Sequence, residues 1–297
     1  MENASGKGVV HSSVTHDSAI KHVTGQAIYV DDIPEPAGLL HVYFGRSTCA
    51  HGEILSMDLS RVESCPGVVA VLTAADIPGA NDISPMHTED EEILCSGEIH
   101  FYGQPLFAVV AESRDIARRA VGLAHIEVRE LPAILTIEQA MEQQAWVADP
   151  HQMMRGDVES ELQNSPHRLK GELHTGSQDH FYLEGQAALA IPQEDGDMLI
   201  ISSTQHPSEL QHLAAQALGR PDNAVTVEVR RMGGAFGGKE TQAAQWALLA
   251  TLVANATGRA AKIRLDRDDD MVSTGHRHDF RIRYEVGFDD RGSIRSI

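Results

Sequence analysis

Alternation of hydrophobic and polar residues predicts a series of β-strands along this chain. Val225, Val227 and Val229 alternate with polar neighbours, and the apolar run at 105–111 is typical of a buried strand. The same pattern predicts the remaining strands at 40–44, 126–130, 198–203, 262–265, 280–288 and 293–297. Because the last two flank the turn Asp289-Asp-Arg-Gly292, they predict a β-hairpin.

Hydrophobic residues at helical spacing predict helices between these strands. From Pro207 onward, apolar side chains fall on one face, and Gly219 is placed to end the helix. Further helices are predicted at 115–125, 137–144 and 241–257, the last ended by Gly258. Strands that alternate with helices indicate a mixed α/β fold.

Changes in composition divide the chain into four segments. Residues 1–15 are polar and rich in serine and glycine, which predicts a flexible N-terminus. We expect a first α/β domain at 16–140, a connector at 141–168 and a second domain at 169–297. The chain ends inside a predicted returning strand, so the second domain is expected to be an incomplete first part.

Charge and composition narrow the function. The chain has 297 residues, and 43 acidic against 24 basic residues give a net charge of −19. Such a surface disfavours nucleic acid and anionic lipid as partners. We find no bilayer-spanning apolar run and no signal peptide, and expect a cytoplasmic protein. The three cysteines, Cys49, Cys65 and Cys95, are too few and too dispersed for an iron–sulfur cluster or an expected disulfide.

The segment Arg231-Met-Gly-Gly-Ala-Phe-Gly-Gly-Lys-Glu240 lies between a predicted strand and a predicted helix. Glycines allow close backbone approach, and a helix N-terminus offers N–H groups to acceptor oxygens, so the segment predicts a ligand cradle. A tight turn without ligand is one alternative. A phosphate-binding loop is another, since Gly233, Gly238 and Lys239 have its spacing, but Glu240 stands where a serine or threonine is required.

This loop resembles the cofactor loop of the xanthine dehydrogenase and aldehyde oxidase family, although Ala235 replaces a third glycine found in many relatives. Further segments resemble the family in the same order and cover nearly all of the chain after residue 15. They are Gly103-Gln-Pro-Leu-Phe-Ala-Val-Val-Ala111, Gln178-Asp-His-Phe-Tyr-Leu-Glu184, Ser203-Thr-Gln205, Pro221-Asp-Asn223, Asp266-Arg-Asp-Asp-Asp-Met271 and Gly275-His-Arg-His278. The resemblance implies a hammerhead-like α/β domain at 16–140, followed by the first part of a molybdopterin-binding mixed α/β domain.

The resemblance also implies roles for four residues. Gln205 matches a glutamine near the molybdenum, and Phe236 and Gly237 match loop residues whose backbone lies beside the molybdopterin cofactor. None of them is expected to ligate the metal through its side chain, because the pterin holds it. Glu240 matches a glutamate that binds a purine substrate. Taken as a bare residue, Gln205 is more typical of a cap or surface group than of a cofactor contact. Glu240 is also typical of an acid that complements a helix dipole, a role that is compatible with binding a purine.

The activity implied by the resemblance is hydroxylation of purines of the hypoxanthine and xanthine type, with water as the oxygen source. Electrons would pass to partner subunits or domains that carry [2Fe–2S] and FAD, in a hetero-oligomer. The family's catalytic glutamate and a substrate-binding arginine are expected beyond Ile297, so no catalytic residue is assigned in this chain. The alternatives are an aldehyde oxidase-like hydroxylase of another substrate and a non-catalytic assembly fragment.

Three other clusters are candidates of lower interest. His276, His278 and Asp279 could contribute to a metal site, although the spacing supplies no further ligand. The acidic run 266–270 lacks the pattern of a calcium loop, and we expect a solvated loop that caps a helix. The segment 180–184 is expected to pack near the cofactor domain.

Overall fold

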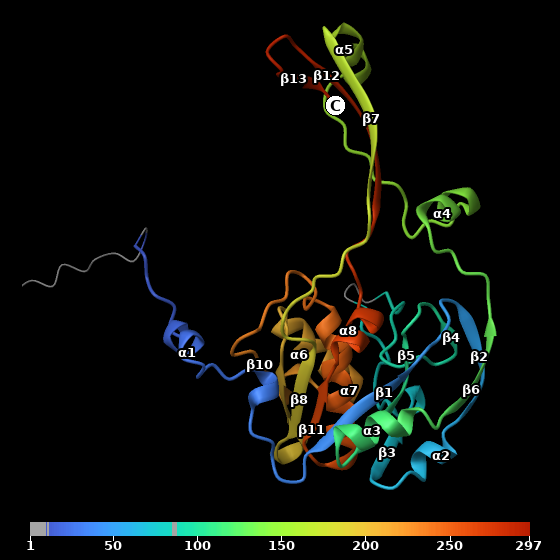
Figure 1. Cartoon of the computed structure of the whole chain (residues 1–297), viewed down its shortest axis with the longest axis vertical. Helices are drawn as coiled ribbons and strands as arrows, with labels where there is room; N and C mark the ends of the chain where they lie inside the picture. The colour runs from blue at the N-terminus through green and yellow to red at the C-terminus, as the bar shows by residue number, and fades with distance from the viewer. Residues whose placement is uncertain (1–9, 11, 85–87) are drawn as a thin grey trace, which may run out of the picture.

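A mixed seven-stranded sheet forms the centre of the molecule in the computed structural model, which describes residue 10, residues 12–84 and residues 88–297 (Figure 1). The predicted flexible segment 1–15 therefore lies largely outside the described residues. Along the sheet, the strands are β10 (Val225–Glu228), β9 (Met198–Ser202), β8 (Ala187–Pro192), β11 (Ala261–Arg264), β1 (Leu40–Arg46), β5 (Pro105–Ala111) and β3 (Val68–Leu72). The pairs β10–β9 and β11–β1 are parallel, and the other neighbours are antiparallel.

The parallel pair in the middle of this sheet joins segments that are far apart in the sequence. Leu40 of β1 lies opposite Ala261 of β11, and Val42 lies opposite Ile263. The predicted domains at 16–140 and 169–297 therefore contribute strands to one continuous sheet. The hydrophobic pattern predicted β1, β5, β9, β10 and β11, but it missed β3 and β8 and did not show which strands pair.

Two smaller antiparallel sheets complete the β-structure. One consists of β4 (Glu98–Ile99), β2 (Gly52–Asp58) and β6 (His125–Glu130). The other consists of β13 (Ile294–Ser296), β12 (Phe280–Phe288) and β7 (His167–Thr175), and it extends away from the main sheet as a long ribbon (Figure 1). The predicted hairpin at 280–297 is confirmed, since β12 and β13 pair across the turn.

Eight α-helices lie within the described residues. They are α1 (Ala19–Val23), α2 (Ser60–Glu63), α3 (Arg114–Val121), α4 (Ile137–Gln143), α5 (Val158–Asn164), α6 (Pro207–Leu218), α7 (Gln242–Thr257) and α8 (Arg267–Ser273). Short 3-10 helices are found at Val30–Asp32, Ala74–Asp76, Glu194–Gly196 and Asp222–Ala224.

The four predicted helices are confirmed in position, and four further helices in the described residues were not predicted. The ends of α6 and α7 are as predicted, because Gly219 and Gly258 adopt left-handed φ values of 63° and 65°. The helix predicted at 115–125 is shorter, since α3 ends at Val121 and Gly122 follows it. The unpredicted helices are α1, α2, α5 and α8. Helix α5, in the predicted connector, has a polar sequence, and none of its residues is buried.

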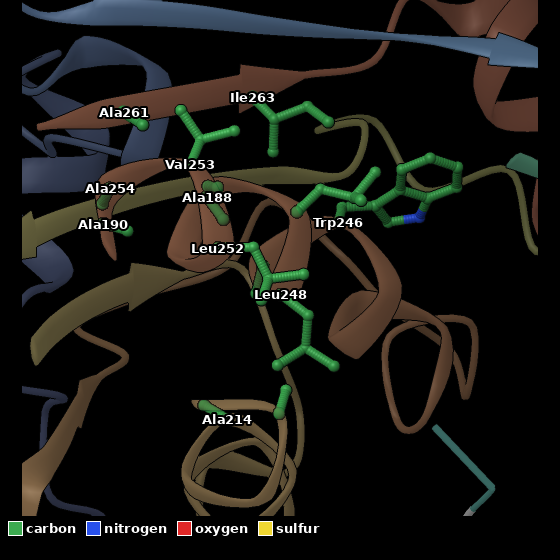
Figure 2. Close-up of a cluster of buried hydrophobic side chains, with 14 of the residues drawn as sticks. Ala188, Ala190, Ala214, Trp246, Leu248, Leu252, Val253, Ala254, Ala261 and Ile263 are labelled. Carbon is green, nitrogen blue, oxygen red and sulfur yellow. The ribbon is translucent and has the colours of Figure 1, made fainter. Parts of the chain in front are cut away.

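Helix α7 forms the middle of the largest hydrophobic core. All of its residues from Ala243 to Ala254 are buried, because it is packed between the main sheet and α6. Figure 2 shows Trp246, Leu248 and Leu252 of α7 among the alanines of β8 and α6 and Ile263 of β11. The Trp246 ring also packs against Phe44 of β1, with 4.8 Å between ring centroids.

The opposite face of the sheet has its own core. Tyr43 of β1 and Phe107 and Val109 of β5 pack there with Ala117 and Ala120 of α3. Since β5 is apolar at every position, both of its faces can be buried, and all seven residues are. The sheet is therefore packed on both faces. The loops that follow β9 and β10, at the ends of two of its strands, form the candidate site.

Candidate functional site

The glycine-rich loop runs from the end of β10 to the start of α7, and its backbone is left-handed at three positions. Gly234, Phe236 and Gly237 have φ values of 96°, 55° and 93°. Glycine adopts such values freely, but phenylalanine does so only at a conformational cost of about 1–3 kcal/mol. The Phe236 side chain is 76% exposed, so its own burial does not offset that cost.

Two glycines are required because the loop packs closely on the segment 180–184. A Cβ at position 233 would lie 2.5 Å from the Cβ of Glu184, and one at position 238 would lie 2.6 Å from Cε1 of Tyr182. The same Cβ at position 238 would also lie 2.7 Å from Cγ of His180. The segment 180–184 thus packs directly against the glycine-rich loop.

Gln205, in the segment that follows β9, forms hydrogen bonds with the backbone of the glycine-rich loop. Its side-chain Oε1 accepts hydrogen bonds from the backbone N–H groups of Gly237 at 3.0 Å and Lys239 at 3.3 Å. Its backbone N–H donates to the carbonyl oxygen of Lys239 at 2.8 Å. Because two donors occupy Oε1, the amide orientation is determined. Gln205 is exposed, and its Nε2 group can serve as a hydrogen-bond donor.

Lys239 is completely buried beneath the loop. Its Nζ lies 3.2 Å from Oε2 of Glu184 and 2.6 Å from Oγ of Ser203, and it sits over the Tyr182 ring at 4.7 Å from the centroid. Burial lowers the pKa of Lys239, and the Glu184 carboxylate opposes that change. A phosphate-loop lysine must reach its phosphate, so the phosphate-binding alternative is wrong.

Glu184 accepts hydrogen bonds from three donors in two segments of the chain. Its Oε2 accepts from the backbone N–H of Gly233 at 2.8 Å and from the hydroxyl of Ser203 at 2.6 Å, in addition to Lys239. Glu184 therefore connects the glycine-rich loop with the end of β9.

The acidic run at 266–270 is buried in part, and the prediction of a solvated loop is wrong. It forms the start of α8, where Asp269 accepts from Tyr43 at 2.5 Å and from Arg46 at 2.8 Å. Asp270 accepts from the Tyr182 hydroxyl at 2.6 Å. The run is charged in sequence, but these partners from distant segments allow the two carboxylates to be buried.

These contacts connect α8 to the loop and change the acidity of the tyrosines. Asp270 also accepts from the backbone N–H of Gln186 at 2.9 Å, and Gln186 Nε2 donates to the carbonyl of Gly238 at 3.0 Å. Burial, together with the hydrogen bond to Asp269, raises the pKa of Tyr43 to about 12. Burial and Asp270 likewise raise the pKa of Tyr182.

The four residues singled out from the sequence are all exposed. Gln205 contacts Gly237, Phe236 precedes it, and Glu240 is exposed one residue before Thr241, the N-cap of α7. Sequence reasoning missed Glu184 and Ser203, which join Lys239 beneath them. Only the unusual lysine inside an otherwise small and apolar stretch hinted at a buried partner.

The other candidates lie elsewhere. His276 Nε2 is 3.4 Å from Asp179 and 3.0 Å from the carbonyl of Met271, and the described residues include no group of three side chains placed to hold a metal. A cavity of about 140 Å³ beside Lys262 is lined by paired charges and lies away from the loop. In the described part of the chain, no helix has the length and apolarity that crossing a membrane requires.

A loop with left-handed glycines, a close packing surface beneath it and a fixed amide donor at its edge is suited to a ligand rich in acceptor atoms. Residues 139–297 match the family model described as the molybdopterin cofactor-binding domain. Residues 24–132 match the a/b hammerhead domain of aldehyde oxidase and xanthine dehydrogenase. The chain belongs to the xanthine dehydrogenase and aldehyde oxidase family of molybdenum hydroxylases, and its predicted fold class is confirmed.

Individual relatives support this assignment. The chain is 40% identical to the xanthine dehydrogenase/oxidase of Gallus gallus over 100% of its own length, and 39% identical to aldehyde oxidase 2 of Cavia porcellus over 97%. It spans 21% of each of these relatives. The crystal structure of quinoline 2-oxidoreductase from Pseudomonas putida 86 is similar over 95% of this chain and 38% of its own, with a TM-score of 0.84 and 27% identity.

Proposed function

We propose that this chain holds the molybdopterin cofactor of a hydroxylase that oxidises hypoxanthine- and xanthine-type purines, with water as the oxygen source. The observation that carries the proposal is the exposed carboxylate of Glu240, presented at the end of the same loop that Gln205 fastens. Purine rings offer N–H donors that a carboxylate can accept, whereas simple aldehydes do not.

Different residues of this chain would bind the cofactor and the purine substrate. The backbone at Phe236 and Gly237 would lie against the cofactor, and Gln205 Nε2 would donate a hydrogen bond to it. Glu240 would accept a hydrogen bond from a purine N–H group and so orient the ring. When bound, the cofactor supplies the two-electron redox chemistry.

The oxidation also requires components outside this chain. Two electrons must leave the site, and we propose that they pass to partner subunits or domains with [2Fe–2S] and FAD centres, in a cytoplasmic hetero-oligomer. The three cysteines of this chain are free thiols, and Cys95 is buried. By the family resemblance, the general base is proposed to be a glutamate outside residues 1–297, and no residue of this chain is assigned that role.

The substrate assignment is tested by Glu240→Ala in the cofactor-loaded enzyme. We expect kcat/KM for xanthine to fall about 10- to 100-fold, the value of one hydrogen bond to a charged group. Activity on an aromatic aldehyde should stay within about threefold of wild type, because an aldehyde makes no such bond. Glu194→Ala, an exposed carboxylate in a 3-10 turn, is the matched control and should change neither activity.

Equal losses on both substrates would remove the purine role of Glu240. The alternative of an aldehyde oxidase-like enzyme is favoured by one specific observation, the 39% identity to aldehyde oxidase 2, which equals that to xanthine dehydrogenases within about one percentage point. Purified enzyme that oxidises aldehydes and not xanthine would establish it. The assembly-fragment alternative is contradicted if the purified protein contains one molybdenum per chain.

A further inference from the structure

Lys239 uses every polar atom it has to join the glycine-rich loop to the end of β9. Its N–H donates to Gln205 Oε1 at 3.3 Å, and its carbonyl oxygen accepts from the Gln205 backbone N–H at 2.8 Å. Its carbonyl also accepts from the Thr204 hydroxyl at 3.3 Å. Its ammonium group is held by Glu184 and Ser203. The position of the Gln205 amide therefore depends on where Lys239 sits.

The ion pair determines that position from beneath. The Lys239 side chain has no exposed surface, and Glu184 is only 12% exposed, so neither charge can exchange its partner for water. The same Glu184 oxygen accepts from Gly233, at the other end of the loop. Glu184 thus holds the loop at both ends, and Gln205 bridges the middle at Gly237.

A second buried lysine shows that burial and pairing alone do not produce this arrangement. Lys262 is also nearly buried and lies 2.8 Å from Asp31 and 3.4 Å from Glu35. Its backbone, however, belongs to β11 and pairs with β1 and β8. Lys262 therefore serves as a matched control, since it is a buried, doubly paired lysine that touches neither the loop nor Gln205.

We propose that the buried pair of Lys239 and Glu184 is a positioning device that holds the Gln205 amide with its Nε2 donor directed at the bound cofactor. The two residues touch neither cofactor nor substrate and act only through Gln205 and the loop. This role rests on the proposed function for its purpose, but the hydrogen bonds that it controls exist in the chain itself.

The first experiment measures those hydrogen bonds without any cofactor. Hydrogen–deuterium exchange is followed for the amides of residues 233–240 in wild type, in Lys239→Met with Glu184→Gln, and in Lys262→Met. The paired substitution removes both charges at similar volume, so it avoids leaving one buried charge without a partner. We expect exchange at Gly237 and position 239 to rise about fivefold to tenfold, as the Gln205 bonds are loosened.

Lys262→Met should leave exchange in this segment unchanged, even if it lowers the melting temperature by a similar amount. If the amides of Gly237 and residue 239 exchange in the paired variant at the same rate as in wild type, the proposal is overturned. An equal rise in Lys262→Met would also overturn it, because the effect would then reflect general loss of stability.

The second experiment uses the molybdenum-loaded enzyme and its Mo(V) electron paramagnetic resonance signal. The paired variant should shift the signal in the same direction as Gln205→Ala, and the combined triple variant should shift it no further, because all three changes act through one amide. Additive shifts, or an unshifted signal at full molybdenum content, would overturn the proposal. A wild-type enzyme without molybdenum would contradict the proposed function, while the exchange experiment would still decide the positioning role.

Discussion

Lys239 illustrates how the meaning of one residue depends on its surroundings. In sequence it stands where a phosphate-binding lysine would stand, but in the structure it is buried against Glu184, Ser203 and the Tyr182 ring. A buried ammonium group is tolerated only where opposite charge and acceptors surround it. The same holds for Asp269 and Asp270, whose tyrosine partners come from segments about 90 to 230 residues away.

The raised pKa of Tyr43 predicts that the stability of the protein falls at high pH. Its pKa is raised from 10.0 to about 12, so the folded state favours the neutral phenol. A raised folded pKa gives stability that is present below pH 10 and is lost as the pH rises towards about 12. We expect wild type to lose more stability than Tyr43→Phe between pH 9.5 and about 12, measured by urea unfolding. Parallel curves would contradict this prediction.

Gly238 tests how closely the loop must pack. In Gly238→Ala the new Cβ would meet Tyr182 and His180 at 2.6 and 2.7 Å, so the loop or the segment 180–184 must move. We expect a loss of about 1–3 kcal/mol in the free energy of unfolding and a fall in bound molybdenum per protein. Gly97→Ala is the control, since its Cβ would meet no atom within 4 Å. Full molybdenum content in Gly238→Ala would show that the loop tolerates displacement.

At the scale of elements, α7 and the strands around it show which predictions transfer from sequence. The helix and its glycine end were predicted from residue spacing, yet its burial on all sides was not. Its apolar residues surround the helix instead of forming one stripe, and only packing between the sheet and α6 accounts for that. The glycine-rich loop is held at the N-terminal end of this rigid helix.

Leu248 measures what this packing contributes. Its side chain is buried between α7 and its neighbours (Figure 2), so Leu248→Ala removes contacts and leaves a cavity. We expect the free energy of unfolding to fall by about 2–5 kcal/mol in a denaturant titration. Leu135→Ala, at a site that is 71% exposed, should change it by less than about 0.5 kcal/mol. A similar small change in Leu248→Ala would mean that the core repacks without a cavity.

At the scale of the whole molecule, the shared sheet makes two sequence segments one folding unit. The family models divide the chain into 24–132 and 139–297, but β1 pairs with β11 across that division. Leu40, Val42 and Phe44 also complete the hydrophobic core that contains α7. Asp269 on α8 adds hydrogen bonds to β1 from the other segment.

Separate expression of the two segments tests this dependence. We expect residues 1–132 and 133–297 each to lack a cooperative thermal transition, because each leaves one side of the β1–β11 pair and half of a core exposed. Mixing or co-expressing them should restore the transition. A segment 133–297 that unfolds cooperatively at the wild-type temperature would show that it folds independently.

The sequence by itself determined eight of the thirteen strands in the described residues, the longer helices and the glycine-rich loop, because these depend on local periodicity and on residues such as Gly219 and Gly258 whose backbone preference is intrinsic. It also supplied the family resemblance on which Gln205, Phe236, Gly237 and Glu240 were selected. Only the tertiary structure decided the pairing of β1 with β11, the burial of Asp269 and Asp270, and the ion pair beneath the loop. Strand pairing and charge burial depend on partners that lie far away in sequence, and local pattern carries no information about them.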